Sequence, residues 1–491
     1  MVDIVIGKNT LESLTTGMYS DAKIIYREYI QNSVDAIDEA IRLKKIKPEE
    51  SFIHIFIDNK NNAISIYDNG TGIHSDKAVN NLLDIGNSSK NYYVNRGFRG
   101  IGRLAGLSYC KKLIFETSYL GEEVKTIITF DAHKLSQMLI PGNCEDHDLI
   151  SVLKEITNIK KEPENKELHY FKVTLEEVEN IDNIMDYDIV KEYLCQVAPL
   201  PYNLKQFPWG KEIKEKLNLL NIKLQEYNIY LEDNKHKTKL YKIYKDYFVS
   251  NLRRKIPDRI KDIEVKIIKD EKDNIIAFMW YAISNYYGTI CDNSIKGLRY
   301  RKGNIQIGDR LTLNDIFLEE RFNGWFQGEI FVLDPNLIPN ARRDNFEKNE
   351  SYFILKNELV KIGEDLSRVI RDTSKNRYNQ RYLHEELFNY ISSNLNHEID
   401  KKKLTKEIDF YKEQLFTYNN IDYNNYEKLQ LLFDKLKAIT RQSEYPKENE
   451  RNLKNLNTTE KKVLNKVFEI IKENYTQKEA NKIINTIISN F

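Results

Sequence analysis

The chain is predicted to be an α+β protein with three domains. Helix-like and strand-like patterns alternate over residues 1–180, and the strands there are mostly joined by short polar turns, which favours one helical layer on one sheet. A second group of strand-like runs with short helices fills residues 181–350. No glycine follows Gly363, so residues 351–491 are expected to be helical. A chain of 491 residues is also too long for a single core.

Individual elements of the first domain follow from local patterns. Asp21 can cap a helix that runs to about Arg42. Strands are predicted at 52–57, 63–67, 113–117, 124–130 and 169–175.

Beyond residue 180 the pattern predicts a helix, several strands and a helical tail. A helical piece at 189–197 and the Pro199–Pro201 break indicate a domain boundary. Strand-like runs follow at 239–244, 275–283, 304–307 and 328–333. In the tail, apolar residues follow a 4-3-4-3 spacing that allows either packing against the preceding domain or a coiled coil: Leu355, Leu359, Ile362, Leu366 and Val369.

The composition excludes several classes of function. The 75 basic and 74 acidic residues leave a net charge of +1, so no overall field points to nucleic acid or to a membrane surface. No apolar run approaches the roughly 20 residues that span a bilayer, and no signal peptide is recognised. Cysteines and histidines lack the spacing of a zinc site. We therefore expect a cytoplasmic protein with no membrane partner.

The first chemical motif lies on the predicted helix at 21–42. Glu28, Asn32 and Asp35 are spaced i, i+4 and i+7, which places them on one helix face. The carboxylate can orient and deprotonate a water molecule, and the amide oxygen can bind Mg²⁺ without adding charge. A solvated helix face would give the same spacing, so this motif alone decides little.

The second motif follows the strand at 63–67. Asp68 comes at the end of that strand and Gly72 soon after it. Such an aspartate can accept a hydrogen bond from the amine of adenine, and the glycine lets a base approach the backbone. A plain β-turn is the alternative for this segment.

The third and fourth motifs are glycine-rich and surround a polar stretch that could act as a lid. Glycines let backbone N–H groups approach phosphate, and a helix expected near Arg103 would add its positive end. No Walker A sequence is present. The four motifs in one stretch predict ATP binding, and the candidate contacts here are Ser89, Lys90, Gly97, Phe98, Arg99, Gly100, Ile101 and Gly102.

Taken together, these motifs resemble the GHKL superfamily of ninety-kilodalton heat-shock chaperones, MutL, type II topoisomerase ATPase subunits, MORC proteins and histidine kinases. The resemblance implies a Bergerat α/β sandwich at 1–180, a transducer-like α+β domain at 181–350 and a helical region at 351–491. It also implies that Glu28 is the catalytic base, Asn32 the Mg²⁺ ligand and Asp68 the adenine contact, with Asn81 a further contact. The glycines that would shape the pocket and lid are Gly72, Gly97, Gly100 and Gly102.

A later segment also carries the resemblance. Residues 328–344 look like the chaperone segment that supplies an arginine to the γ-phosphate, which points to Arg343, with Arg342 as the near alternative. A cation from a second domain would stabilise the transferring phosphoryl group. A nearby basic cluster is expected to be a solvated strand: Lys296, Arg299, Arg301 and Lys302.

One departure from the family pattern stands out. The last nucleotide motif of the family is a Gly-Thr step, and Tyr170-Phe171 takes its place here. The hydrogen bond that this threonine makes is therefore in doubt.

The function implied is an ATP–Mg²⁺-gated switch that closes, forms an ATP-dependent homodimer and acts on an unidentified protein or DNA partner. The first choice is a MORC/MutL-like bacterial ATPase in DNA repair or anti-phage defence, favoured by the lid at residues 85–90 and by Phe98 and Arg99. The alternative is a chaperone-like ATPase that remodels protein clients, favoured by the Arg343 segment. A protein that uses ATP only to order its own structure is disfavoured by the presence of Glu28.

Overall fold

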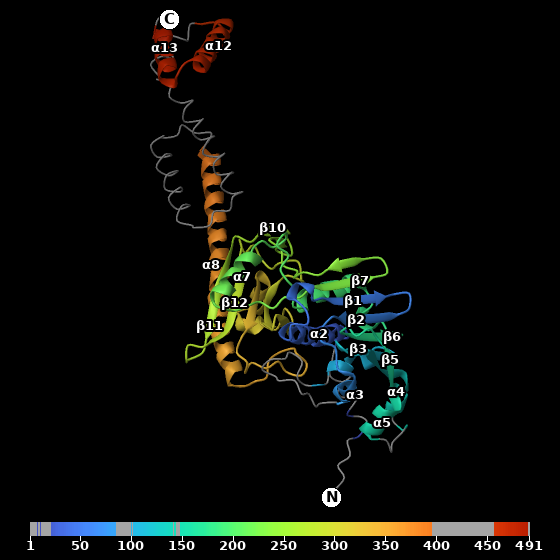
Figure 1. Cartoon of the computed structure of the whole chain (residues 1–491). Coiled ribbons are helices and arrows are strands. Elements are labelled where there is room, and N and C mark those ends of the chain that lie inside the picture. Colours follow the sequence, from blue (N-terminus) through green and yellow to red (C-terminus); the bar gives the residue numbers. More distant parts are fainter. Residues whose placement is uncertain are drawn as a thin grey trace. The chain divides into compact units, whose positions relative to one another are not determined.

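The structure is a computed structural model that describes residues 21–84, 100, 102–140, 142–143, 148–394 and 456–489, together with Gly7 and Thr10. The chain separates into two compact units, Met1–Arg371 and Asp372–Phe491 (Figure 1). The predicted α+β class is confirmed, because the first unit holds two large sheets with helices against them and the described part of the second unit is helical. The predicted domain boundaries at 180 and 350 stay predictions.

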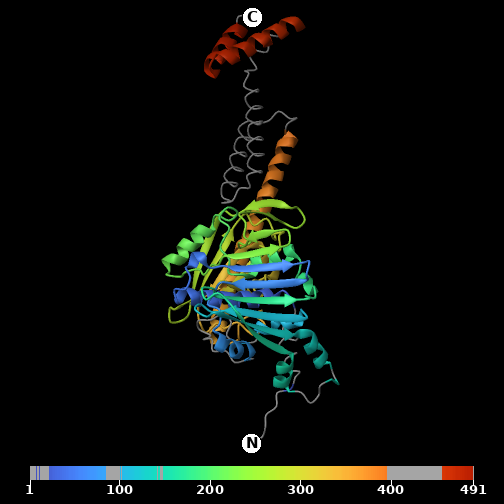
Figure 2. The same ribbon diagram turned by 45° about the vertical axis from the view of Figure 1, so that its right-hand side comes forward.

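The first sheet has eight strands in the order β5-β4-β3-β6-β2-β1-β7-β8, and Figure 2 shows them lying side by side. Neighbours are antiparallel except β1 and β7, which are parallel. The five predicted strands are present. Their bounds and those of three unpredicted strands are β1 Ile53–Asp58, β2 Ala63–Asp68, β3 Lys112–Ser118, β4 Val124–Asp131, β5 Thr157–Pro163, β6 Tyr170–Glu176, β7 Ile229–Asp233 and β8 Lys237–Lys239.

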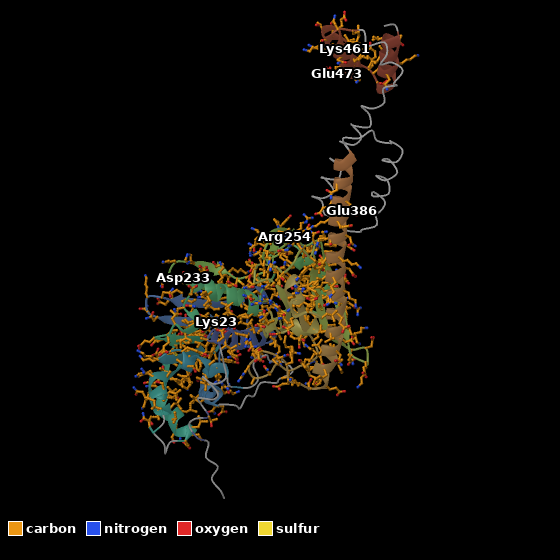
Figure 3. The ribbon with its side chains drawn as sticks, turned by 180° about the vertical axis from the view of Figure 1, so that it is seen from behind. Lys23, Asp233, Arg254, Glu386, Lys461 and Glu473 are labelled. Atoms are coloured by element: carbon orange, nitrogen blue, oxygen red, sulfur yellow. The ribbon has the colours of Figure 1, made fainter. Side chains whose placement is uncertain are left out.

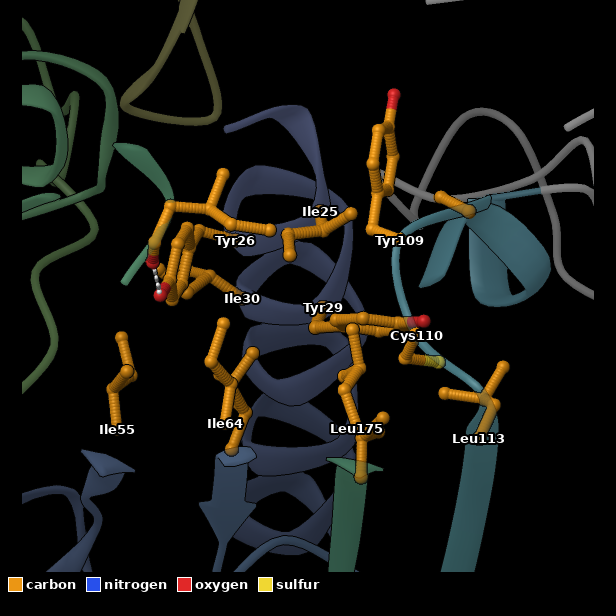
Figure 4. Close-up of a cluster of buried hydrophobic side chains, with 14 of the residues drawn as sticks. Ile25, Tyr26, Tyr29, Ile30, Ile55, Ile64, Tyr109, Cys110, Leu113 and Leu175 are labelled. Atoms are coloured by element: carbon orange, nitrogen blue, oxygen red, sulfur yellow. Dashed lines mark hydrogen bonds between the residues drawn. The ribbon is translucent and has the colours of Figure 1, made fainter. Parts of the chain in front are cut away.

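Helix α2, Ile24–Arg42, covers one face of the first sheet and forms its core. Figure 4 shows Ile25, Tyr26, Tyr29 and Ile30 of α2 above Ile64 and its neighbours on the strands. Every second residue of β2 is buried, as expected for a strand with one face in the core. Complete burial of the two isoleucines of β2, Ile64 and Ile66, stabilises the fold by about 1.5–3 kcal/mol each.

Shorter helices complete the first sheet's domain: η1 Pro48–Glu50, α3 Ser75–Leu83, η2 Gly102–Ser108, α4 Ala132–Leu139, α5 Leu149–Ile156 and η3 Ile181–Asn183. The helix expected near Arg103 is not an α-helix but the short 3-10 helix η2. Tyr29 explains this tight winding, because its hydroxyl donates to the carbonyl of Arg103 at 3.1 Å and accepts from the amide of Gly106 at 3.0 Å. One side chain thus occupies backbone groups that an α-helix would pair internally.

The second sheet has five strands in the order β11-β12-β15-β13-β14. Its predicted strands at 275–283, 304–307 and 328–333 are confirmed. The run predicted at 239–244 is wrong: β8 ends at Lys239, and only an isolated bridge at Lys242 follows within 240–244. The elements of this region are α6 Tyr187–Val197, α7 Gly210–Leu219, β9 Tyr247–Ser250, β10 Ile256–Arg259, β11 Asp262–Lys269, β12 Ile275–Ile283, β13 Gly297–Lys302, β14 Ile305–Ile307, η4 Asn314–Ile316, η5 Glu320–Trp325 and β15 Gln327–Val332.

Helix α8, Glu350–Asn394, begins in the first unit. Leu355, Leu359 and Leu366 are buried in the core of the second sheet's domain, so the 4-3-4-3 spacing marks a packing face there. Val369 instead is 45% exposed, and Ile370 takes the buried position. In the second unit, α12 (Thr458–Asn474) and α13 (Gln477–Ser489) confirm the helical prediction for those residues.

Candidate active site

Helix α2 presents the first predicted motif. Glu28 is 5% exposed and Asp35 is 4% exposed, while Asn32 between them is partly buried. The opposite side of the helix carries the isoleucines and tyrosines of the core, which fixes the direction in which the motif points. A solvated helix face is therefore excluded for Glu28 and Asp35.

Arg343 reaches Glu28 from a loop 315 residues away in sequence. Its Nε donates to Oε1 of Glu28 at 2.9 Å, and the two side chains are only 8% and 6% exposed. Arg342 is exposed, and it contributes its backbone carbonyl to Arg27 at 3.1 Å. Of the two candidate arginines, Arg343 is thus the one whose side chain meets the predicted base.

The loop that carries Arg343 is held by backbone contacts that sequence reasoning missed. Arg343 has φ of 57°, its amide donates to the carbonyl of Asn340 at 3.1 Å, and its carbonyl accepts from the amide of Gly308 at 2.9 Å. Gly308 has φ of 69°, and a Cβ there would lie 2.7 Å from the carbonyl oxygen of Asp344. Any side chain at Gly308 would therefore displace the turn that presents Arg343. The only signal in the sequence was the Gly308-Asp309 pair, which is typical of a turn.

Gly102 closes the other side of Glu28. A Cβ at Gly102 would lie 2.1 Å from Oε2 of Glu28, so any other residue there would force the carboxylate to shift. Gly100 is described too, and its carbonyl accepts from Nε of Arg103 at 3.2 Å. Burial lowers the pKa of this arginine from its ordinary value. The end of the glycine-rich motif is therefore brought to the first motif.

The second motif lies at the end of β2. Asp68 is 1% exposed, and its Oδ1 accepts from the amide of Gly70 at 2.9 Å. Gly72 has φ of 62°, and a Cβ there would lie 1.8 Å from the carbonyl oxygen of Ser118. Glycine at position 72 is thus required by the approach of β3, whatever else it contacts.

The position of the missing Gly-Thr step can be located on the first sheet. Phe171 pairs with Asp68 on one side and with Thr117 on the other. The Thr117 hydroxyl is buried, accepting from the amide of Ile73 at 2.8 Å and donating to the carbonyl of Tyr170 at 3.1 Å. A threonine hydroxyl therefore lies one strand beyond the expected position. Sequence reasoning missed it because strand order is not visible in the sequence.

Other predicted contacts are not brought to Glu28 by any described interaction. Asn81 lies on α3 and is exposed. Six predicted contacts lie outside the described residues: Ser89, Lys90, Gly97, Phe98, Arg99 and Ile101.

The expectation of a solvated basic strand is wrong for β13. Arg299 and Arg301 are each 1% exposed. Arg301 pairs with Glu329 of β15 at 2.6 Å, and Lys242 meets the same carboxylate at 2.8 Å. Burial lowers the pKa of Lys242 to about 7. Burial acts to raise the pKa of Glu329, but the two cations outweigh it and hold that pKa at about 2.

These buried arginines also join the second sheet to helix α6, which lies between β6 and β7 of the first sheet in the chain and packs in that sheet's core. Arg299 donates to Oε1 of Gln196 at 2.9 Å and Arg301 to the carbonyl of Val197 at 3.4 Å, both at the end of α6. Ile305 of β14 belongs to the core of the first sheet. The pairing of Arg343 with Glu28 is therefore one contact of a wider interface between the second sheet and the first sheet's domain.

The donor set near Glu28 fits magnesium in one limited sense. Within the described ranges, no three histidine, cysteine, aspartate or glutamate side chains gather as a metal site. Mg²⁺ that arrives with a nucleotide needs only one or two protein oxygens besides phosphate, and the carboxamide of Asn32 beside buried Glu28 can supply one. Among the helices that the structure describes, none is long and apolar enough to cross a membrane.

Comparison with known proteins agrees with this geometry. Residues 19–162 match the family described as histidine kinase-, DNA gyrase B-, and HSP90-like ATPase. The chain is 28% identical over 132 residues to the chaperone protein HtpG of Buchnera aphidicola, covering 23% of this chain and 21% of that protein. It is 27% identical over 257 residues to HtpG of Wigglesworthia glossinidia brevipalpis, covering 46% and 40%. It is 25% identical over 201 residues to HtpG of a Sulfurovum species, covering 37% and 31%.

The predicted resemblance to the GHKL superfamily is thus confirmed. The matched family covers α2 and the strands from β1 to β5, where Glu28 and Asp68 lie. The chain spans less than half the length of these chaperone relatives.

Proposed function

We propose that this chain binds and hydrolyses ATP, with Glu28 as the base that activates the attacking water. The observation that carries the proposal is the buried Glu28 carboxylate, enclosed by Gly102 and contacted by Arg343 at 2.9 Å. A carboxylate in such a place can hold a water molecule and accept its proton.

Other residues have supporting roles in the proposal. Asp68 would accept a hydrogen bond from adenine, and Asn32 would give an oxygen to Mg²⁺, which when bound neutralises phosphate charge. Asp35, which is buried on the same helix face, would complete the polar wall of the pocket.

Arg343 would change partners during the cycle. Paired with Glu28, its guanidinium occupies Oε1 of the carboxylate, so that oxygen is not available to a water molecule. A γ-phosphate carries more negative charge than one carboxylate, so it would draw the guanidinium away and leave Oε1 of Glu28 open to the attacking water. Hydrolysis would then require the second sheet's loop to be in place, which makes the ATPase a switch between domains.

Substitution of the base tests the proposal. Glu28→Gln keeps the size of the side chain and removes its basicity, so we expect hydrolysis to fall about 100-fold or more while nucleotide affinity changes only a few-fold. Steady-state ATPase assays and titration with a fluorescent nucleotide would measure the two quantities. Hydrolysis at the wild-type rate would show that Glu28 is not the base.

For the biological role we propose a chaperone-like ATPase that remodels a protein partner and forms an ATP-dependent homodimer. The proposal is supported by the three HtpG relatives. Two of these matches, over 257 and 201 residues, are longer than the segment 19–162 that matches the ATPase family. ATP-dependent suppression of the aggregation of a model client would be the expected activity, and Glu28→Gln should abolish its turnover.

The DNA-directed role, a MORC/MutL-like ATPase in repair or anti-phage defence, is the second candidate. It rests on the Gly97-Phe98-Arg99-Gly100 sequence, of which only Gly100 is among the described residues. Retention on closed circular DNA that depends on a non-hydrolysable ATP analogue would favour this role. If the chain does not bind DNA at low salt but still suppresses aggregation of the client, the DNA-directed role would be excluded in favour of the chaperone-like role.

A further inference from the structure

Strands β9 and β10 form a hairpin whose turn is held by its own backbone. The amides of Arg253 and Arg254 both donate to Oδ1 of Asn251, at 3.2 and 3.1 Å. The amide of Lys255 donates to the carbonyl of Asn251 at 2.8 Å, and the amide of Asn251 donates to the carbonyl of Thr289 at 2.9 Å. The turn therefore holds its side chains in a preformed arrangement, which lowers the ordering cost of binding a partner.

Positively charged side chains without carboxylate partners gather on this hairpin and just after it. Among the described residues, no carboxylate pairs with the exposed side chains of Arg253, Arg254, Lys255, Arg259 and Lys261. Figure 3 labels Arg254.

The neighbouring charges explain why this group stands out. The only acidic residue within 253–261 is Asp258, which is buried and accepts from the side-chain amide of Asn285 at 2.9 Å. Other lysines of this region have carboxylate partners: Lys214 with Glu226, Lys216 with Glu212 and Lys245 with Asp292. The hairpin is thus a local positive patch on a chain whose net charge is only +1.

Apolar side chains are exposed between these cations. Tyr247 is 67% exposed and lies opposite Arg259 in the register of the two strands, and Val249 lies opposite the exposed Pro257. Leu252 in the turn is 56% exposed. Arginine and tyrosine beside aliphatic groups is the composition found at the energetic centre of protein–protein interfaces.

The outer edge of β10 cannot accept a further strand. The carbonyl of Val249 accepts from the amide of Cys291, so Val249 and its partner Pro257 point their backbone groups away from each other. Pro257 has no N–H to offer, and the amide of Arg259 already donates to Oδ1 of Asp258 at 2.9 Å. A partner must therefore be recognised through side chains.

We propose that the β9–β10 hairpin binds an acidic segment of a partner protein in which carboxylates alternate with apolar residues. The guanidinium groups of Arg253, Arg254 and Arg259 would pair with carboxylates, for which their planar shape is suited. Tyr247 and Leu252 would contact the apolar residues between those carboxylates. The inference rests on the proposed chaperone-like role, because it names the class of protein segment on which that role would act.

A nucleic acid would use this surface less completely. Phosphates could meet the same cations, and a base could stack on Tyr247. The aliphatic groups of Val249, Leu252 and Pro257, however, would gain little from a sugar–phosphate backbone, whereas leucine or phenylalanine side chains would bury them. The exposed aliphatic groups therefore favour a peptide.

Fluorescence anisotropy of the full chain without nucleotide tests the proposal, with a labelled peptide of repeating Glu-Leu-Asp-Phe as the probe. Arg253→Glu, Arg254→Glu and Lys255→Glu in one chain should weaken binding about tenfold or more, because repulsion replaces attraction. Tyr247→Ser with Leu252→Ser should weaken it about fivefold through lost apolar contact. A peptide with lysine in place of both acidic residues should not bind.

The matched control makes the same change of charge at exposed positions of α5 and β5. This variant should keep its affinity within about twofold of the wild type, because only charges near the peptide act strongly. Circular dichroism would check that each variant is folded. The substitutions of the control are Lys154→Glu, Lys160→Glu and Lys161→Glu.

Three results would overturn the proposal. They are a wild type that does not bind the acidic peptide at low salt, equal losses in the hairpin variant and the control, and tighter binding of single-stranded oligodeoxythymidine than of the peptide at the same hairpin residues. The assay contains no ATP, so its result is independent of hydrolysis. A chain that binds the peptide but does not hydrolyse ATP would refute the proposed ATPase activity and support the binding surface.

Discussion

Glu28 and Arg343 form a buried ion pair in which each side chain supplies the other's polar partner. Each is almost fully buried, and a single buried charge costs several kcal/mol unless an opposite charge meets it. The left-handed backbone of Arg343 and the turn at Gly308 place the guanidinium where that requirement is met. The same two residues are those that the proposed hydrolysis needs, so stability and activity are linked at this pair.

Arg343→Ala should reduce both stability and activity. It leaves Glu28 buried without the guanidinium, which should lower the free energy of unfolding by about 3 kcal/mol and hydrolysis by about 100-fold. Thermal denaturation and ATPase assays would measure the two effects. Arg342→Ala is the matched control. Because the Arg342 side chain is exposed, its removal should change the free energy of unfolding by no more than about 0.5 kcal/mol. Equal effects of the two substitutions would contradict the assignment of Arg343.

Gly102→Ala should impair the action of Glu28 as the base without changing the Glu28 side chain itself. The added methyl group would lie 2.1 Å from Oε2 of Glu28, so the carboxylate must move. A displacement of this size should lower the rate of hydrolysis by about 100-fold, with a smaller change in nucleotide affinity. Gly7→Ala is a control, because a Cβ there would meet nothing within 4 Å. If Gly102→Ala hydrolyses ATP at the wild-type rate, the Glu28 carboxylate can move aside without loss of activity, which would contradict the prediction.

At the level of elements, β13 and β15 form the interface through which the second sheet contacts the first part of the chain. Arg301 of β13, Glu329 of β15 and Lys242 form one buried network, and Tyr202 adds a hydrogen bond to the carboxylate at 2.5 Å. Buried charges in such a network hold a fixed geometry, because each loses its partners if the strands shift. This interface is therefore suited to hold the loop that carries Arg343 at a fixed position relative to α2.

The network should make stability depend on pH. Burial lowers the pKa of Lys242 to about 7 from the ordinary 10.5, so between these values the unfolded chain binds the proton that the folded chain has released. Stability should then rise with pH across this window, because the unfolded state binds more protons. Denaturant titrations from pH 7 to 9 would measure the slope, which Lys242→Met should reduce. Lys205→Met, at an exposed position, should leave it unchanged, and identical slopes in all three proteins would refute the prediction.

Elements with strong local patterns could be predicted from the sequence, and elements defined by partners could not. The alternation of β1 and β2 and the apolar face of α2 are visible in the chain, so their positions were predicted correctly. Strand β7 was missed because it joins the first sheet by pairing with β1, 176 positions earlier at Tyr230 and His54. The burial of Arg299 and Arg301 was missed for the same reason, since their partners come from other segments.

For the molecule as a whole, the site is assembled from two distant stretches of sequence. The motifs at Glu28 and Asp68 could be recognised because they are local, and Arg343 could be predicted only through a family resemblance. Thr117 and Gly308 were not predictable, because their roles arise from strand order and from a loop contact. A protein built in this way can make hydrolysis conditional on how its domains meet.

The most direct test of that account is a double-mutant cycle on the rate of ATP hydrolysis with Glu28→Gln, Arg343→Ala and the combined variant. If both side chains act on one step in one site, each single substitution should slow hydrolysis strongly, and the combined variant should be little slower than the slower single variant. Losses that simply multiply, or a single variant that hydrolyses ATP at the wild-type rate, would contradict the proposal that Arg343 and Glu28 work as a unit.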